Sequence, residues 1–154
     1  MWPEYLHHLF LQIPISGAIG LSILGVAYVR QPAQNLEKLL RYMGWGLFFC
    51  IIAASVSGIL SAPGALGGAG PEELSHHRNM GLMVFFFAAS SAIAFEVGIR
   101  DQTSASQYIK KTAALMWIAV ALSAVGAGHW GGSVVHSDQI PWDKSQPAIQ
   151  KLKK

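Results

Sequence analysis

Four long apolar runs dominate the chain and limit what it can fold into. They cover roughly residues 9–29, 39–60, 80–99 and 112–130, and no lysine or arginine lies in the interior of any run. A helix needs about 20 mostly apolar residues to cross a bilayer, and each run meets that length. Because the connections are short, consecutive helices must be antiparallel neighbours. The sequence therefore predicts an all-α integral membrane protein, a four-helix up-down-up-down bundle.

The composition excludes several other classes of protein. Only 12% of residues are charged, against about 25% in a typical soluble domain. The hydrophobic content of 52% and net charge of +3 exclude a disordered chain, and the single cysteine, Cys50, excludes a disulfide framework. The basic residues form short clusters between apolar runs, with no basic face, so we expect no nucleic-acid binding.

The chain is predicted to consist of two segments. Residues 1–136 form the predicted four-helix transmembrane domain, and residues 137–154 form a polar C-terminal tail that contains Pro141 and Pro147 and ends in lysines. The first apolar run is predicted to be a retained span rather than a signal peptide. Residues 1–8 carry no lysine or arginine, and no clear cleavage site follows the run.

The basic residues predict the orientation of the bundle. Lysine and arginine in short loops favour the cytoplasmic side of a membrane. The first and third loops and their flanks hold most of these residues: Arg30, Lys38, Arg41, Arg100, Lys110 and Lys111. Both termini are therefore expected on the periplasmic face of a bacterial inner membrane. Glu96, four residues before Arg100, has the spacing of a helical ion pair, and we interpret it as structural.

The six histidines all fall at the predicted periplasmic end of the bundle. They are His7, His8, His76, His77, His129 and His136. Ionisable residues in or near the membrane are candidates for function. The alternative is that amphipathic histidine rings simply sit at the headgroup level. Glycine and alanine near these histidines allow close helix packing, and they also leave room for a flat macrocycle.

The chemistry of imidazole narrows what such a group could bind. Imidazole suits zinc, copper, iron and nickel, but structural zinc sites usually include cysteine, and Cys50 lies in the middle of a span. Haem iron in a helix bundle takes axial ligands from facing helices. No C-x-x-C-H motif is present, so a haem would be held without covalent bonds, as b-type haem. The best predicted ligand pair is His77 with His129. His7, His8 and His136 are further candidates, which would allow one haem or two, and His76 ranks last.

The chain resembles, in three short motifs, a bacterial family of four-helix membrane proteins of unknown function. These motifs are His7 followed by Ile13–Pro14, the pair His77–Arg78, and the run His129–Trp130–Gly131–Gly132. The resemblance covers about residues 6–138 and implies a haem-binding, b-type cytochrome-like module. Two positions depart from the family pattern. Gln12 stands where a second histidine is common, and Asp138 stands where a later histidine is usual, with His136 in the place of a tyrosine.

Four functions follow as alternatives. The first is a membrane electron-transfer protein with haem b, which would exchange electrons with a c-type cytochrome or a quinone-linked complex. The second is a quinol-oxidising enzyme with a histidine as proton acceptor. Against it, no carboxylate lies in the outer half of a predicted span to relay protons inward, and no catalytic residue is singled out. The third is an accessory subunit of a larger membrane redox complex. The fourth is a divalent-metal-binding membrane protein without haem. We expect an electron-transfer subunit rather than a stand-alone enzyme.

Overall fold

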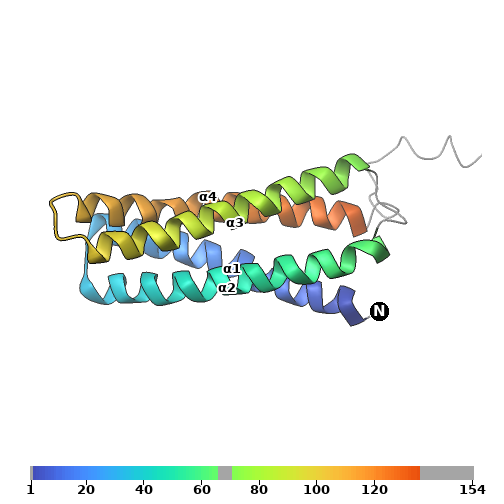
Figure 1. Cartoon of the computed structure of the whole chain (residues 1–154), viewed down its shortest axis with the longest axis horizontal. Helices are drawn as coiled ribbons and strands as arrows, with labels where there is room; N and C mark the ends of the chain where they lie inside the picture. Colours follow the sequence, from blue (N-terminus) through green and yellow to red (C-terminus); the bar gives the residue numbers. More distant parts are fainter. Residues whose placement is uncertain (1, 66–70, 136–154) are drawn as a thin grey trace, which may run out of the picture.

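The computed structural model of the chain describes residues 2–65 and 71–135. This part forms four helices and no strand: α1 (Trp2–Arg30), α2 (Gln34–Ala65), α3 (Pro71–Arg100) and α4 (Ser106–Val135) (Figure 1). Each helix contains a stretch long and apolar enough to cross a membrane: Gln12–Arg30, Gln34–Ile59, Ser75–Arg100 and Ser106–Gly131. The predicted all-α class and the four spans are confirmed. The helices exceed the apolar runs because they continue into the more polar flanks. The predicted tail, residues 137–154, lies outside the described residues.

The four helices are antiparallel to their neighbours in the chain. The contact between α3 and α4 is the most extensive, α1 packs against both α2 and α4, and α2 contacts α3 less closely. The helices α1 and α3 lie at opposite corners of the bundle, and among the described residues their backbones do not come close. The rings of Tyr28 on α1 and Phe95 on α3 nevertheless meet edge to face across the core, with centroids 5.7 Å apart. Figure 1 shows that α1 begins at the end of the bundle where α4 ends. We call this the histidine end, and we call the opposite end, with the turns at residues 31–33 and 101–105, the basic end.

The core combines small residues with a few large ones. Ala18, Ala88 and Ala113 are fully buried, and Trp117 and Tyr28 are the two largest buried side chains. A Cβ atom on Gly25 would collide with the carbonyl oxygen of Ala114, so α1 and α4 touch backbone to backbone there. Small residues permit such close approach of membrane helices.

The hydroxyls of a buried serine and a half-buried serine join the helices at two further points. The hydroxyl of Ser91 on α3 donates to the carbonyl of Ala113 on α4 at 2.7 Å. The hydroxyl of Ser22 on α1 contacts the carbonyls of Ala18 and Trp117 at 2.7 and 2.8 Å. Hydrogen bonds of this kind hold membrane helices together where hydrophobic burial offers little driving force between them.

Large apolar side chains cover the outside of the bundle. They include Ile23, Tyr42, Phe49, Phe86 and Leu122, each more than 60% exposed. Such a surface is stable only against an apolar solvent, and the lipid bilayer supplies one. These exposed apolar side chains are consistent with contact between the helices and lipid.

The two turns at the basic end are shorter than the gaps between the apolar runs, residues 30–38 and 100–111, because α2 begins at Gln34 and α4 at Ser106. In the second turn, the backbone N–H and hydroxyl of Thr103 donate to the carboxylate of Asp101 at 2.9 and 2.7 Å. These hydrogen bonds hold the pKa of Asp101 below its usual range, and the bond from the Thr103 hydroxyl has the larger effect.

Candidate functional site

His77 is the histidine whose surroundings are best defined. It lies near the start of α3, and its Nδ1 is 2.9 Å from the carbonyl oxygen of Ala127 on α4. A carbonyl oxygen only accepts hydrogen bonds, so Nδ1 carries the proton and donates it. The ring also rests on Gly131, where a Cβ atom would lie 3.0 Å from Cε1 and Nδ1. The ring is thus fixed in orientation, with Nε2 as its acceptor nitrogen.

A second group of rings lies beside His77 on the same two helices. The rings of His76 and Trp130 are stacked, with centroids 4.7 Å apart and planes inclined by 21°. His129 meets Trp130 edge to face at 5.6 Å. His76 and Trp130 are half-buried, whereas His129 is exposed. At the histidine end, His76 and His77 of α3 therefore contact α4 at Trp130 and Ala127, and His129 contacts only the outer side of this group through Trp130.

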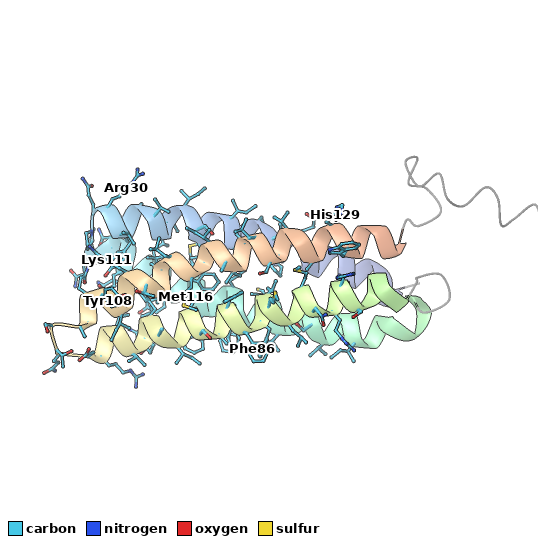
Figure 2. The ribbon with its side chains drawn as sticks, turned by 90° about the horizontal axis from the view of Figure 1, so that it is seen from above. Arg30, Phe86, Tyr108, Lys111, Met116 and His129 are labelled. Carbon is cyan, nitrogen blue, oxygen red and sulfur yellow. The ribbon has the colours of Figure 1, made fainter. Side chains whose placement is uncertain are left out.

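The predicted pair His77 and His129 shares a level along the bundle but not a face of α4. His77 contacts Ala127 and Gly131, which are four residues apart and lie on one face. His129 is two residues from each, so it projects roughly 160° around the helix axis from both. Figure 2 labels His129 near the end of α4. The structure brings His77 onto α4 and leaves the side chain of His129 facing outward.

The histidines of α1 lie further out. A Cβ atom on Gly128 of α4 would meet the side chain of Ile15 on α1, which fixes how the two helices are aligned. His8 precedes Ile15 by seven residues, so its backbone lies roughly 10 Å further along α1 toward the histidine end. His7 lies one residue beyond it. The side chains of His7 and His8, and all of His136, are outside the described residues.

One face of α3 continues from His77 toward the middle of the bundle. Gly81, Val84 and Ala88 continue the face of α3 that begins at His77. Val84 and Ala88 are buried, but a Cβ atom on Gly81 would meet nothing within 4 Å. Figure 1 shows the α1–α2 pair diverging from the α3–α4 pair toward this end. This face of α3 therefore passes from the buried residues Val84 and Ala88 to Gly81, where an added Cβ atom would be unobstructed.

The described histidines limit what the described part of this end could hold by itself. Among the residues whose side chains are described, no three of histidine, cysteine, aspartate or glutamate lie close enough to hold a metal. Zinc needs three or four protein ligands. A haem needs only one or two axial ligands from the protein, because its macrocycle supplies the others. His77, with its ring fixed in orientation, could serve as one such axial ligand.

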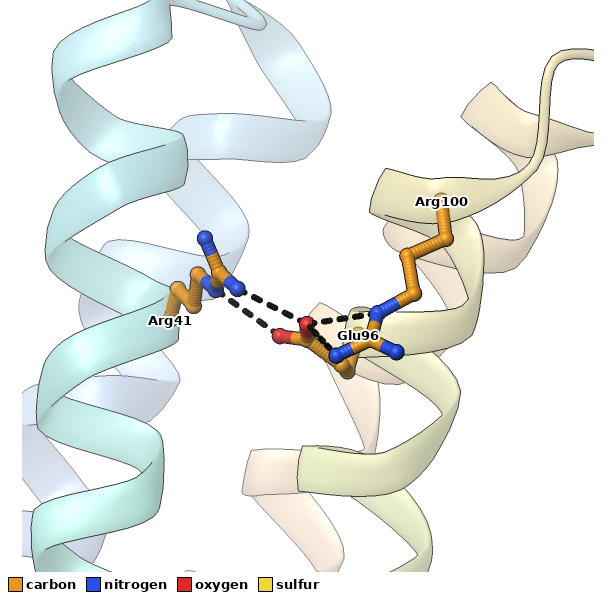
Figure 3. A network of polar contacts seen from close by, with 3 residues as sticks. All are labelled: Arg41, Glu96 and Arg100. Carbon is orange, nitrogen blue, oxygen red and sulfur yellow. Dashed lines mark hydrogen bonds and ion pairs between the residues drawn. The ribbon is translucent and has the colours of Figure 1, made fainter.

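An ion-pair network occupies the opposite, basic end. The guanidinium of Arg41 on α2 donates to both carboxylate oxygens of Glu96 on α3, at 2.8 and 2.7 Å. Arg100 donates to the same carboxylate from Nε at 3.0 Å, and its Nη2 lies 2.9 Å away (Figure 3). The predicted helical pair of Glu96 with Arg100 is confirmed. The bidentate contact with Arg41, which joins two helices, was not predicted.

A second network joins three helices nearby. The carboxylate of Glu37 on α2 accepts hydrogen bonds from Tyr28 of α1 at 3.0 Å and Lys110 of α4 at 2.8 Å. The sequence contains a signal for these contacts, because Glu37, Arg41 and Lys110 all flank predicted spans at one end. Which partner each of these residues contacts depends on which helices are adjacent, and residue spacing in the sequence does not show that.

Comparisons with protein-family models, with curated proteins and with solved structures find no match for this chain. The resemblance to a family of four-helix membrane proteins therefore stays a prediction.

Proposed function

We propose that the chain is a membrane-bound, b-type cytochrome-like electron-transfer protein with a histidine-ligated haem at the histidine end. The observation that carries the proposal is the hydrogen bond from Nδ1 of His77 to the carbonyl of Ala127 at 2.9 Å. Histidines that ligate metals characteristically donate their other ring N–H to a carbonyl or carboxylate, which fixes the tautomer and orients the ring. His77 has this arrangement, so its Nε2 is oriented and available to bind haem iron as an axial ligand.

The neighbouring residues support the same assignment. Gly131 gives the imidazole room against α4, and Gly81, on the face of α3 that follows His77, presents no side chain to a flat, apolar ring. When bound, haem iron would supply one-electron redox chemistry, tuned by its axial ligands and by burial. The chain's own contribution is to orient the ligand and to exclude water with apolar helices.

The second axial ligand comes from the other histidines of this end. His129 is level with His77 but would have to turn toward α3 in order to share an iron with it. His7, His8 and His136 are the remaining candidates. We further propose that this end faces the periplasm of a bacterial inner membrane, where a c-type cytochrome or a quinone-linked complex would exchange electrons with the haem.

Haem and metal analysis of the full chain, purified in mild detergent, tests the proposal. We expect one or two haems per chain that acid extraction removes, with the pyridine haemochrome spectrum of b-type haem. Replacing His7, His8, His129 and His136 by alanine one at a time should identify the second ligand, with His76→Ala as control. A chain that contains no haem from haem-sufficient cells would refute the proposal. Stoichiometric zinc or copper in its place would establish a metal site without haem.

A further inference from the structure

An apolar groove lies on the outer surface between α1 and α4, toward the basic end. Its volume is about 400 Å³, and it is lined by Ser22, Ile23, Val26, Ala27, Arg30 and Ile118. Ser22 and Ala27 are small, and Ile23 and Ile118 are exposed. The hydroxyl of Ser22 is engaged with backbone carbonyls, so the groove offers almost purely hydrocarbon contact along its length.

The guanidinium of Arg30 is the one charge that lines this groove. Arg30 is the last residue of α1 and is exposed. Arg41, Arg100 and Lys110 at the same end are each paired with a carboxylate. Within the described part of the chain, Arg30 has no such partner. An anion from outside the protein is therefore the counterion that this position can accept.

Lys111 adds a second cation beside the groove. The contacts of Ser22 with Trp117 and of Gly25 with Ala114 fix the alignment of α1 and α4. Because the two helices are antiparallel, moving three residues further along each one brings Lys111 of α4 beside the last turn of α1. Lys111 also shares a face of α4 with Ala114 and Ile118. Figure 2 shows Arg30 and Lys111 at the same end of the bundle.

We propose that this groove is a binding site for an anionic phospholipid, with one acyl chain in the groove and the phosphate held by Arg30 and Lys111. Basic residues at the ends of membrane helices attract anionic headgroups. A zwitterionic lipid or a neutral quinone would match the apolar wall but would leave the two cations without net negative charge. The combination of groove and cations therefore selects an acidic lipid.

Native mass spectrometry of the detergent-solubilised full chain with phosphatidylglycerol and phosphatidylcholine tests this site. At equal lipid concentrations, we expect the wild-type chain to retain phosphatidylglycerol preferentially, by about tenfold or more. Arg30→Gln and Lys111→Gln should each reduce that preference by roughly fivefold, as expected for one cation near a headgroup. Lys38→Gln removes an exposed cation from α2 at the same end and should leave the preference unchanged.

A second pair of variants tests the groove apart from the charges. Ala27→Leu fills the groove and should reduce retention of phosphatidylglycerol, whereas Ala53→Leu, on an exposed position of α2, should not. The proposal is overturned if the wild-type chain binds both lipids equally. It is also overturned if the Arg30→Gln/Lys111→Gln double variant keeps the preference, or if glycerol phosphate, which lacks acyl chains, displaces the lipid.

Discussion

One ring nitrogen determines what His77 can do. Its Nδ1 donates to Ala127, and the ring fits against α4 only because residue 131 has no side chain. The hydrogen bond and the glycine together hold Nε2 in one direction. Precise support of this kind is what a ligand needs, because a loosely held ligand binds metal less tightly.

Gly131→Ala tests this dependence at the residue scale. The new Cβ atom would lie 3.0 Å from the His77 ring, so the ring should shift and weaken its bond to Ala127. We expect lower haem occupancy, measured as the ratio of Soret to protein absorbance after purification. Gly46→Ala is the matched control, because a Cβ atom there would meet nothing within 4 Å. Equal occupancy in both variants would contradict the role given to Gly131.

The helices are held together by two kinds of contact at the element scale. One is close backbone approach at glycine, as between Gly25 of α1 and Ala114 of α4. The other is the pair of carboxylates at the basic end, Glu37 and Glu96, which tie all four helices through Tyr28, Lys110 and Arg41. Removing either kind of contact should loosen the bundle in a way that unfolding measurements can detect.

Gly25→Ala should destabilise the bundle by roughly 1–3 kcal/mol, because α1 must move away from the backbone of Ala114. Gly20→Ala lies on the same helix, where a Cβ atom would meet nothing within 4 Å, and should be neutral. Unfolding in mixed detergent micelles, followed by circular dichroism, gives the two free energies. Similar stability of the two variants would show that α1 and α4 are not in tight contact.

Glu96→Gln should lower the free energy of unfolding by about 2 kcal/mol, because a neutral amide replaces the carboxylate that accepts hydrogen bonds from Arg41. The Glu96 side chain is only 14% exposed, so water would compensate little. Arg100→Gln should cost less than about 0.5 kcal/mol, since the Arg100 side chain is 76% exposed and pairs within one helix. The same unfolding assay compares them. A larger effect at Arg100 than at Glu96 would contradict the interhelical role of this network.

The sequence predicted much of the fold at the scale of the whole molecule. Four apolar runs of membrane-spanning length determine four helices, and short connections determine their antiparallel order. The pair Glu96–Arg100 follows from helical spacing alone. The ion pair of Glu96 with Arg41 on α2 and the contact of His77 with Ala127 on α4 could not be predicted. They depend on how each helix is rotated about its own axis, and uniformly apolar runs carry little information on rotation.

The orientation of the molecule gives a further prediction. Excess lysine and arginine at the basic end predicts that the turns at residues 31–33 and 101–105 face the cytoplasm. In a Cys50→Ala background, Ala33→Cys and Ser104→Cys should react with a membrane-impermeant maleimide only in inside-out vesicles. Labelling of either position in intact cells with a permeabilised outer membrane would reverse the predicted orientation.

The visible spectrum of the His77→Ala variant tests ligation by His77 most directly. The purified wild-type protein should show a Soret band with sharp α and β bands that strengthen on reduction. His77→Ala should lose the low-spin spectrum or the haem itself, imidazole should restore it in part, and His76→Ala should resemble the wild type. A His77→Ala variant that keeps the full low-spin spectrum at wild-type haem content would contradict ligation by His77.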